Sequence, residues 1–406
     1  MQNPKLRSDI DVMPVEVDGK KIYAVSDTLG LIKGPIGISE DILEVMILLD
    51  GTRSLEDIRA ELARMRSGES LRVDEVERIV SELDSAMILE NGNYLKGKAG
   101  LIRTFVESPV REAFLSGKAY PGTKPELEAY LGGILRDDEE EKSGSDTGLI
   151  GLVAPHIDLE VGKEGYRAAY RQIVGYEPER VVILGTGHRV SEGLFSLTKK
   201  DFETPLGLLE NDKEAVSALE IAGAGLISKN DFDHRNEHSI EFQALFLKYL
   251  FKEKPFKIIP VLCGDISAFP GRYSSFSQVP GVTSFCSALK NLIEDTNCLV
   301  VAGVDLSHIG PKFGNQQPAS ELDALATQHD MESINAVSKK NNQEFWSLLE
   351  KGDKKYNVCG ASSLATLLEI MPDFKGNIAH YTMWHEESTL SAVSFCSMGL
   401  SPKGQD

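Results

Sequence analysis

The feature that most constrains the fold is a regular alternation of short apolar runs and longer amphipathic segments, which begins at Leu149. Residues 181–184, a run of Val, Val, Ile and Leu followed by Gly-Thr-Gly, are typical of a strand that is buried on both faces. Strands that alternate with helices build a largely parallel sheet covered by helices on both faces. We therefore predict an α/β fold for this part of the chain.

The expected elements of this region follow from its hydrophobic periodicity. The expected strands span 149–154, 181–184, 257–262, 298–303 and 392–398. The expected helices span 125–135, 162–174, 213–222, 239–251, 284–296, 320–338, 342–350 and 361–370. The charged run at 136–148 is expected to be a solvated loop.

The first 98 residues are expected to form a separate small α+β domain, with residues 99–406 as the second domain. Two short strands are predicted around the turn Asp18-Gly19-Lys20, and three helices are predicted to begin near Ser39, Ser54 and Asp74. A hairpin is expected at 88–95 around Asn91-Gly92. Helices followed by such a hairpin are typical of a winged helix.

Charge and composition exclude several classes of function. The 406-residue chain has a formal charge of −19, and its first 95 residues hold 11 Lys and Arg against 19 Asp and Glu, so nucleic acid is not an expected partner. No apolar run is long enough to span a membrane, and the first residues, which lack an apolar segment, are not expected to act as a secretory signal. Five cysteines without a CxxC pair favour reduced thiols and a cytoplasmic location.

Polar side chains follow four of the predicted strands. His156 and His188 come after the first two strands, the segment Cys263-Gly264-Asp265 after the third, and Asp305 and His308 after the fourth. Because parallel strands end at one edge of a sheet, we expect these groups to converge there. Two histidines with an acidic or thiolate group can bind a transition metal. Each histidine alone could equally well bond a neighbouring carbonyl.

Two further segments supply candidate groups. Glu237, His238 and Glu241 open a predicted helix, so one of them could reach the cleft as an acid, a base or an orienting group. Acidic groups in a first helical turn also suit the helix dipole without any chemistry. Cys359 lies just before another predicted helix, a position expected to lower its thiol pKa and favour the thiolate.

Six motifs follow one another over residues 101–400: Ser116-Gly117-Lys118-Ala119-Tyr120-Pro121, Ala154-Pro155-His156, Gly185-Thr186-Gly187-His188, Asn236-Glu237-His238-Ser239-Ile240-Glu241, Asp305-Leu306-Ser307-His308 and Cys359-Gly360. In this order they resemble the Memo family, which includes the AmmeMemoRadiSam system protein B. The resemblance implies a fold similar to class III extradiol dioxygenases and a cleft in which His156, His188 and Cys359 bind iron or copper. It also implies that Asp305, His308, Glu237 and His238 line that cleft.

Two features differ from the family pattern. The segment Ile157-Asp158-Leu159-Glu160 replaces an aromatic and glycine segment, and Arg189 stands where a second histidine is usual. The N-terminal region is additional, and it resembles the PqqD-like domains, which bind a peptide along a strand edge. A domain that only mediates self-association is the alternative for this region.

Three functions remain open from the sequence. The first is an iron- or copper-dependent redox or oxygenase-like enzyme that acts on an unknown small substrate, with His308 or His238 as acid or base. The second is a non-catalytic adaptor that binds a peptide or a radical SAM protein through its N-terminal region. The third is a metal-free hydrolase with Cys359 as the nucleophile and His308 as the base.

Overall fold

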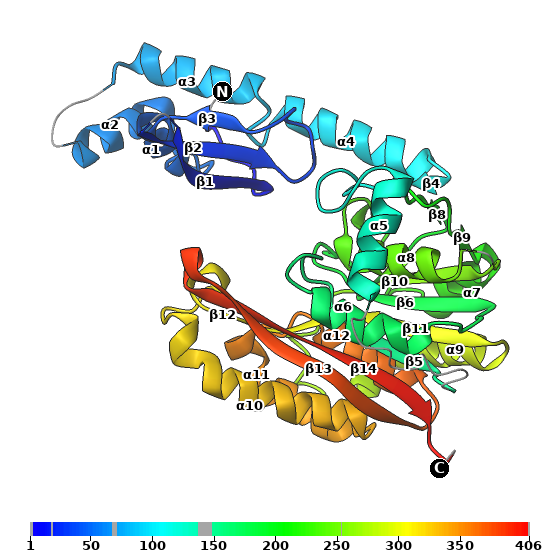
Figure 1. The fold of residues 1–406 in the computed structure, drawn as a ribbon. Coiled ribbons are helices and arrows are strands. Elements are labelled where there is room, and N and C mark those ends of the chain that lie inside the picture. The colour runs from blue at the N-terminus through cyan, green and yellow to red at the C-terminus, as the bar shows by residue number, and fades with distance from the viewer. Residues whose placement is uncertain (1–2, 18, 67–70, 137–147, 253, 405–406) are drawn as a thin grey trace. The chain divides into compact units, whose positions relative to one another are not determined.

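The computed structural model describes residues 3–17, 19–66, 71–136, 148–252 and 254–404 (Figure 1). The chain divides into two compact units, Met1–Glu107 (unit 1) and Ser108–Asp406 (unit 2). Most of the acidic run predicted to be a loop, residues 137–147, lies outside the described residues, as does Asp18 of the predicted turn. None of the helices in the described ranges is long and apolar enough to cross a bilayer.

Unit 1 combines a small antiparallel sheet with four helices in its described part. The sheet has the order β1-β2-β3, and the two strands predicted from the sequence are its first two members. The second helix begins after Ser54, as predicted, and Ser54 caps it in a reciprocal capping box with Asp57. The elements are β1 Ile10–Val17, β2 Lys20–Asp27, β3 Ile36–Ile38, α1 Glu40–Ile47, α2 Leu55–Met65, α3 Val73–Ser85 and α4 Gly92–Glu107.

The hairpin predicted at 88–95 is wrong, because α4 begins at Gly92 and runs through the second half of that segment. The side-chain oxygen of Asn91 accepts hydrogen bonds from the backbone N–H groups of Asn93 and Tyr94, at 3.0 and 3.2 Å. The Asn-Gly pair therefore starts a helix here instead of closing a turn, since Asn suits both positions. Leu89 instead pairs with Leu6 in an isolated bridge. The winged-helix prediction, which needs this hairpin, is not confirmed.

Unit 2 is built on a nine-stranded sheet within the described residues. Its centre has the order β5-β11-β6-β10, and these four strands are all parallel, as predicted. The flanking strands β7, β12, β13 and β14 run antiparallel to their neighbours. The sheet strands are β5 Gly151–Ala154, β6 Arg180–Thr186, β7 Phe195–Leu197, β9 Glu210–Asn211, β10 Lys257–Cys263, β11 Cys298–Gly303, β12 Asp305–Ile309, β13 Phe374–Glu386 and β14 Ser391–Pro402.

Helices cover both faces of this sheet, which the alternation of strands and helices predicts (Figure 1). In β6, Val181 and Ile183 pack into one core cluster, while Val182 and Leu184 pack into the other. All four are fully buried, and each such side chain stabilises the fold by about 1.5–3 kcal/mol. One face carries α5 Lys124–Leu135, α6 Lys163–Tyr170 and α8 His238–Leu250; the other carries α7 Lys213–Ala222, α9 Val282–Glu294, α10 Ala319–Ser338, α11 Asn342–Tyr356 and α12 Ala361–Ile370.

The parallel centre determines where functional groups can meet. The carboxyl ends of β5, β6, β10 and β11 lie along one edge of the sheet, because these strands point the same way. The residues that follow β5, β6 and β11 are those that the sequence marks as polar strand ends. Strand β13 was not predicted, although it forms a long pair with β14. The two short strands β4 Val110–Arg111 and β8 Asp201–Phe202 pair with each other outside the main sheet.

Candidate metal centre

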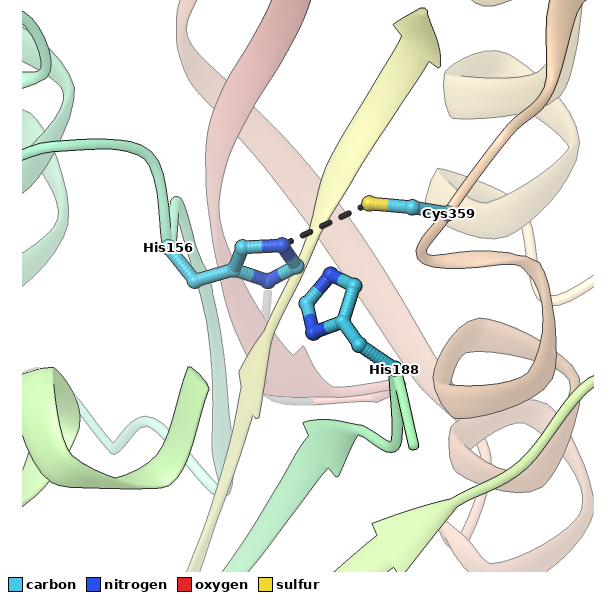
Figure 2. A group of neighbouring side chains, drawn as sticks. All are labelled: His156, His188 and Cys359. Atoms are coloured by element: carbon cyan, nitrogen blue, oxygen red, sulfur yellow. Dashed lines mark hydrogen bonds between the residues drawn. The ribbon is translucent and has the colours of Figure 1, made fainter. Parts of the chain in front are cut away.

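Three side chains from distant parts of the chain meet at the carboxyl edge of the central sheet. His156 follows β5, His188 follows β6, and Cys359 lies directly before α12 (Figure 2). Each offers one ligand atom, and these three atoms all lie within 4.8 Å of one another. Metal–ligand bonds of about 2.0–2.3 Å place two ligand atoms no more than about 4.6 Å apart, so the cluster is close to the size that a metal ion needs.

His156 presents a free ring nitrogen to this cluster. Its Nδ1–H donates a hydrogen bond to the carbonyl oxygen of Gly303 at 2.9 Å, which leaves Nε2 without a proton. This Nε2 lies 3.4 Å from the sulfur of Cys359 (Figure 2). The residue is 2% exposed, and its burial lowers the pKa of the imidazole to about 3. His156 is therefore neutral at physiological pH, which is the form that binds metals.

His188 is oriented by the carboxylate of Glu237. The ring Nδ1 lies 3.0 and 3.1 Å from the two carboxylate oxygens, and the backbone N–H of His188 donates to the same group at 3.2 Å. Burial would raise the pKa of Glu237, but its hydrogen bond with His188 holds that pKa well below the usual range. Loss of solvation at the site likewise opposes the protonation of His188, which is partly exposed, yet the Glu237 carboxylate raises the pKa of this imidazole. A carboxylate on one ring nitrogen directs the other nitrogen toward a metal.

The expected low pKa of Cys359 is wrong. Burial, together with the neighbouring Asp305 carboxylate, raises the pKa of this thiol well above its usual value. The loss of solvation outweighs the dipole of the short helix that follows. A bound cation reverses this balance, because a coordinated thiol is deprotonated outright. The donor set therefore fits a metal ion: two imidazoles whose Nδ1 atoms are already held by hydrogen bonds, and a thiol that needs a cation to become a thiolate.

Asp305 and His238 lie beside the three candidate ligands. One oxygen of Asp305 accepts a hydrogen bond from the backbone N–H of His156 at 3.0 Å, and the other lies 3.6 Å from His156 Nε2. Asp305 is 2% exposed, and burial raises its pKa. The ring of His238 lies 5.2 Å from that of His156 and stacks on that of His188 at 4.9 Å. Burial lowers the pKa of His238 to about 4.

A second, overlapping group consists of His188, Glu237 and His238, whose ligand atoms also lie within 4.8 Å of one another. The Nδ1 of His238 lies 3.2 Å from the Glu237 carboxylate. Because Glu237 already accepts from His188 and from the backbone N–H of Ser239, we interpret this group as the support of His188.

His308 stands somewhat apart from the cluster. Its Nδ1–H donates to the carbonyl oxygen of Leu306 at 3.0 Å, and its ring packs edge-on against Phe313. Burial lowers the pKa of His308. The sulfur of Cys359 contacts His156 Nε2 and the backbone oxygen of Asp305 instead of His308. This geometry argues against a hydrolase that pairs Cys359 with His308.

The sequence analysis did not single out Arg111, whose side chain fixes the backbone of Glu237 by a hydrogen bond. Arg111 is fully buried and donates hydrogen bonds to the carbonyl oxygens of His234 and Glu237, at 2.9 and 3.0 Å. It also forms an ion pair with Glu241. A buried arginine in a two-residue strand, more than 120 residues before its partners, leaves no local signal in the sequence.

Glu241 does not reach the cleft, contrary to one of the sequence-based alternatives. Its second oxygen accepts hydrogen bonds from the hydroxyl of Tyr120 at 2.5 Å and from the backbone N–H of Leu115 at 2.9 Å. Two of the quoted motifs therefore meet in this buried contact, because Tyr120 belongs to one and Glu241 to the other. Glu241 neutralises Arg111, and Arg111 fixes the backbone of Glu237.

A cavity of about 420 Å³ adjoins the candidate ligands. It lies between the loops that follow β6 and β10 and the segment that leads into α12. Its lining residues are Thr186, Gly187, His188, Cys263, Gly264, Asp265, Ile266, Ser267, Asn357, Val358, Cys359, Ala361 and Ser362.

The similarity to known proteins extends over all the candidate metal ligands and their supporting residues. A family model described as Memo-like protein matches residues 111–399. A MEMO1 family protein of Aquifex aeolicus is 29% identical over 91% of this chain and 95% of its own length. A MEMO1 family protein of Nitrosopumilus maritimus is 27% identical over 67% of this chain and 92% of its own length. The Protein memo-1 homolog of Caenorhabditis elegans is 26% identical over 71% of this chain and 81% of its own length.

Proposed function

This chain belongs to the Memo-like protein family, and we propose that it binds iron or copper through His156, His188 and Cys359 for a redox or oxygenase-like reaction on a small substrate. The observation that carries this proposal is the meeting of two imidazoles and a thiol within 4.8 Å. Two imidazoles with a thiolate suit iron or copper, whereas a closed set of four ligands is typical of structural zinc. When bound, the metal would supply Lewis-acid and one-electron chemistry.

The protein's own residues would orient these ligands and move protons. Glu237 holds His188 through Nδ1, and Asp305 holds the backbone of His156. His238 and His308 are the proposed acid–base residues, and because burial lowers the pKa of both, each would begin as a neutral base. The parallel sheet with polar groups at its carboxyl edge supports the proposed relationship to class III extradiol dioxygenases and to the AmmeMemoRadiSam system protein B.

Anaerobic titration with Fe(II) or Cu(I) tests the proposed ligands. We expect one equivalent of metal per wild-type chain, and at least a tenfold loss of affinity in His156→Ala, His188→Ala and Cys359→Ser. His380→Ala, a change on strand β13, is the matched control and should bind like the wild type. Stoichiometric binding that survives all three ligand substitutions would refute the site.

An adaptor role for unit 1 is the second candidate, and one observation favours it. Strand β1, with eight residues, pairs only with β2 among the described strands, so its other edge can accept an added strand. We propose a peptide or a radical SAM protein as the partner, in line with the resemblance to PqqD-like domains. Capture of purified radical SAM proteins by the full chain should disappear when residues 1–107 are deleted; retention by the shortened chain would contradict this role.

A further inference from the structure

Strand β12, which carries Asp305 and His308, contains a β-bulge. The register of β12 against β14 shifts between these two residues. Two residues of β12, Leu306 and Ser307, therefore lie opposite the single residue Ser394 of β14. An extra residue of this kind bends a strand and changes the direction of its side chains, and such bulges are frequent beside active sites.

The bulge brings Asp305 and His308 to the same side of the strand. In a regular strand two residues that are three positions apart point to opposite faces, because successive side chains alternate. Here a carboxylate oxygen of Asp305 lies 3.6 Å from Nε2 of His156, and His308 lies within electrostatic range of both groups. Without the extra residue, Asp305 and His308 would point to opposite faces and only one of them could face the candidate ligands.

The backbone of the bulge also holds the segment that carries Cys359. The carbonyl oxygen of Leu306 accepts hydrogen bonds from the backbone N–H of Cys359 at 3.3 Å and from the ring of His308 at 3.0 Å. The carbonyl oxygen of Asp305 accepts one from the backbone N–H of Gly360 at 3.0 Å. A Cβ at position 360 would lie 2.6 Å from this oxygen, so the close approach requires glycine. The thiol and the His308 ring therefore share one support.

A buried network of hydroxyl groups around Asp330 of α10 holds the bulge. The backbone N–H of Ser307 donates to the hydroxyl oxygen of Ser394 at 2.9 Å, which satisfies a backbone group in the irregular part of the ladder. The Asp330 carboxyl group accepts hydrogen bonds from the hydroxyls of both serines, at 2.6 and 2.5 Å. The hydroxyl of Tyr381 in β13 donates to the same group at 3.0 Å.

This network lies in the core of unit 2. Ser307, Ser394 and Asp330 are all 0% exposed. A carboxyl group buried this deeply is destabilising unless it is hydrogen-bonded, and two of the three hydrogen bonds of Asp330 go to the two residues that face each other at the bulge.

We propose that Asp330 is a positioning residue for the metal centre. It keeps the bulge in β12 through the hydroxyls of Ser307 and Ser394. The bulge in turn directs Asp305 and His308 toward the candidate ligands. The inference rests on the proposed function only for the metal and the reaction that these groups serve, because the network and the bulge exist in the chain without a metal.

Substitutions of two serines in β14 test this role. Ser394→Ala removes the acceptor of the Ser307 N–H and one donor to Asp330, so the bulge should lose its fixed geometry. Ser397→Ala is the matched control, because its hydroxyl is also 0% exposed and donates to the carbonyl oxygen of Gly165 at 2.6 Å, outside the bulge. Ser307→Ala removes the other serine donor to Asp330 and carries the same test should Ser394→Ala fail to fold.

The first readout needs no metal. Proton–carbon NMR of the histidine rings in the metal-free full chain reports the surroundings of His308 and His156, whose signals are assigned by their alanine variants. Ser394→Ala and Ser307→Ala should shift both signals. They should leave that of His234, whose ring bonds to a backbone carbonyl elsewhere in unit 2, in place.

The second readout is anaerobic titration with Fe(II) or Cu(I). The affinity should fall about tenfold in Ser394→Ala and Ser307→Ala, as for other groups that orient metal ligands, because the bulge holds the backbone of Cys359 and Asp305 holds that of His156. Ser397→Ala should match the wild type in both readouts.

Three outcomes would overturn the proposal. They are unmoved His308 and His156 signals in both test variants, equal shifts in Ser397→Ala, and shifted signals with an unchanged affinity in a chain that binds metal. A wild-type chain that binds neither iron nor copper would refute the proposed metal centre instead, and the NMR comparison would still decide whether the Asp330 network directs the groups of β12.

Discussion

Each unit contains an arginine that is almost completely buried, and the two arginines serve different purposes. Arg7 in unit 1 and Arg111 in unit 2 are 1% and 0% exposed. Arg7 pairs with Asp9 and Asp27 and donates to the carbonyl oxygen of Met87, so it joins the N-terminal segment to its own sheet and to the end of α3. Arg111 pairs with one carboxylate, that of Glu241, and donates three more hydrogen bonds to the backbone carbonyls of Glu112, His234 and Glu237.

The difference lies in what these hydrogen bonds hold. The partners of Arg7 have no part in the candidate metal centre. One partner of Arg111 is the backbone of Glu237, whose side chain orients His188. The same kind of buried ion pair therefore stabilises a small module in unit 1 and, in unit 2, also sets the position of a candidate metal ligand.

Substitution of the two arginines should give the largest effects and separate these roles. Arg7→Met and Arg111→Met should each lower the free energy of unfolding by about 3–5 kcal/mol, because each leaves a buried carboxylate unpaired. Only Arg111→Met should also weaken metal binding, by about 10–100-fold, because Glu237 loses its backbone anchor. Urea unfolding and metal titration measure the two quantities.

Tryptophan fluorescence tells the two units apart in these experiments, since both tryptophans, Trp346 and Trp384, belong to unit 2. Arg7→Met should shift the circular dichroism of the whole chain and leave the fluorescence transition in place. Equal losses of metal affinity in both variants would mean that Arg111 has no specific effect on the site.

Tyr120→Phe should have a smaller effect of the same kind. It removes the hydroxyl that donates to Glu241 and leaves the ion pair with Arg111 intact. We expect the free energy of unfolding to fall by about 1.5–3 kcal/mol, as for a hydrogen bond to a charged group, while metal affinity changes by less than about threefold. Tyr176→Phe, which removes an exposed hydrogen bond to the neutral side chain of Asn297, is the control and should cost less.

The smallest expected effect is a difference in pH dependence between two buried carboxyls. Burial tends to raise the pKa of Asp27, but hydrogen bonds from Arg7 and from two backbone N–H groups outweigh burial and lower this pKa below 3.8. Its contribution to stability is therefore present above pH 3.8 and is lost as the pH falls through the lowered pKa. Asp330 in unit 2 has three hydroxyl partners, and burial raises its pKa above 3.8. Its contribution is largest below pH 3.8 and is lost as the pH rises through the raised pKa.

Urea unfolding of Asp27→Asn and Asp330→Asn between pH 3 and 7 measures these slopes. Each substitution should remove at most about 1.4 kcal/mol per pH unit, the limit for one proton, and the two changes should have opposite signs. Changes of the same sign would show that the two carboxyls do not differ in the way that their partners indicate.

The parallel centre of unit 2 could be predicted because its signals are local. Buried apolar runs such as 181–184 predict strands, and the structure contains these strands. His156 and His188 follow the ends of two of them, as the sequence predicts. The segment around Asn91 was mispredicted because Asn-Gly suits a hairpin turn and a helix start equally well. Local patterns of this kind predict an element only where one structure is favoured.

The remainder of the site depends on contacts that no local pattern records. Arg111 meets Glu237 across more than 120 residues, and the pKa of Cys359 depends on burial that only the folded chain produces. Strand β13 alternates partly buried and exposed residues along the outer side of β14, without the continuous apolar run that marks the central strands. In each case the missing information is tertiary.

X-ray absorption at the metal edge of the copper- or iron-loaded full chain tests the central claim most directly. The account predicts two nitrogen scatterers at about 2.0–2.1 Å and one sulfur scatterer at about 2.3 Å. The sulfur contribution should vanish in Cys359→Ser and persist in Cys263→Ser, since Cys263 lines the same cavity but belongs to neither group of candidate ligands in the described residues. A spectrum with only oxygen and nitrogen scatterers, identical in the wild type and in Cys359→Ser, would contradict the proposed metal centre.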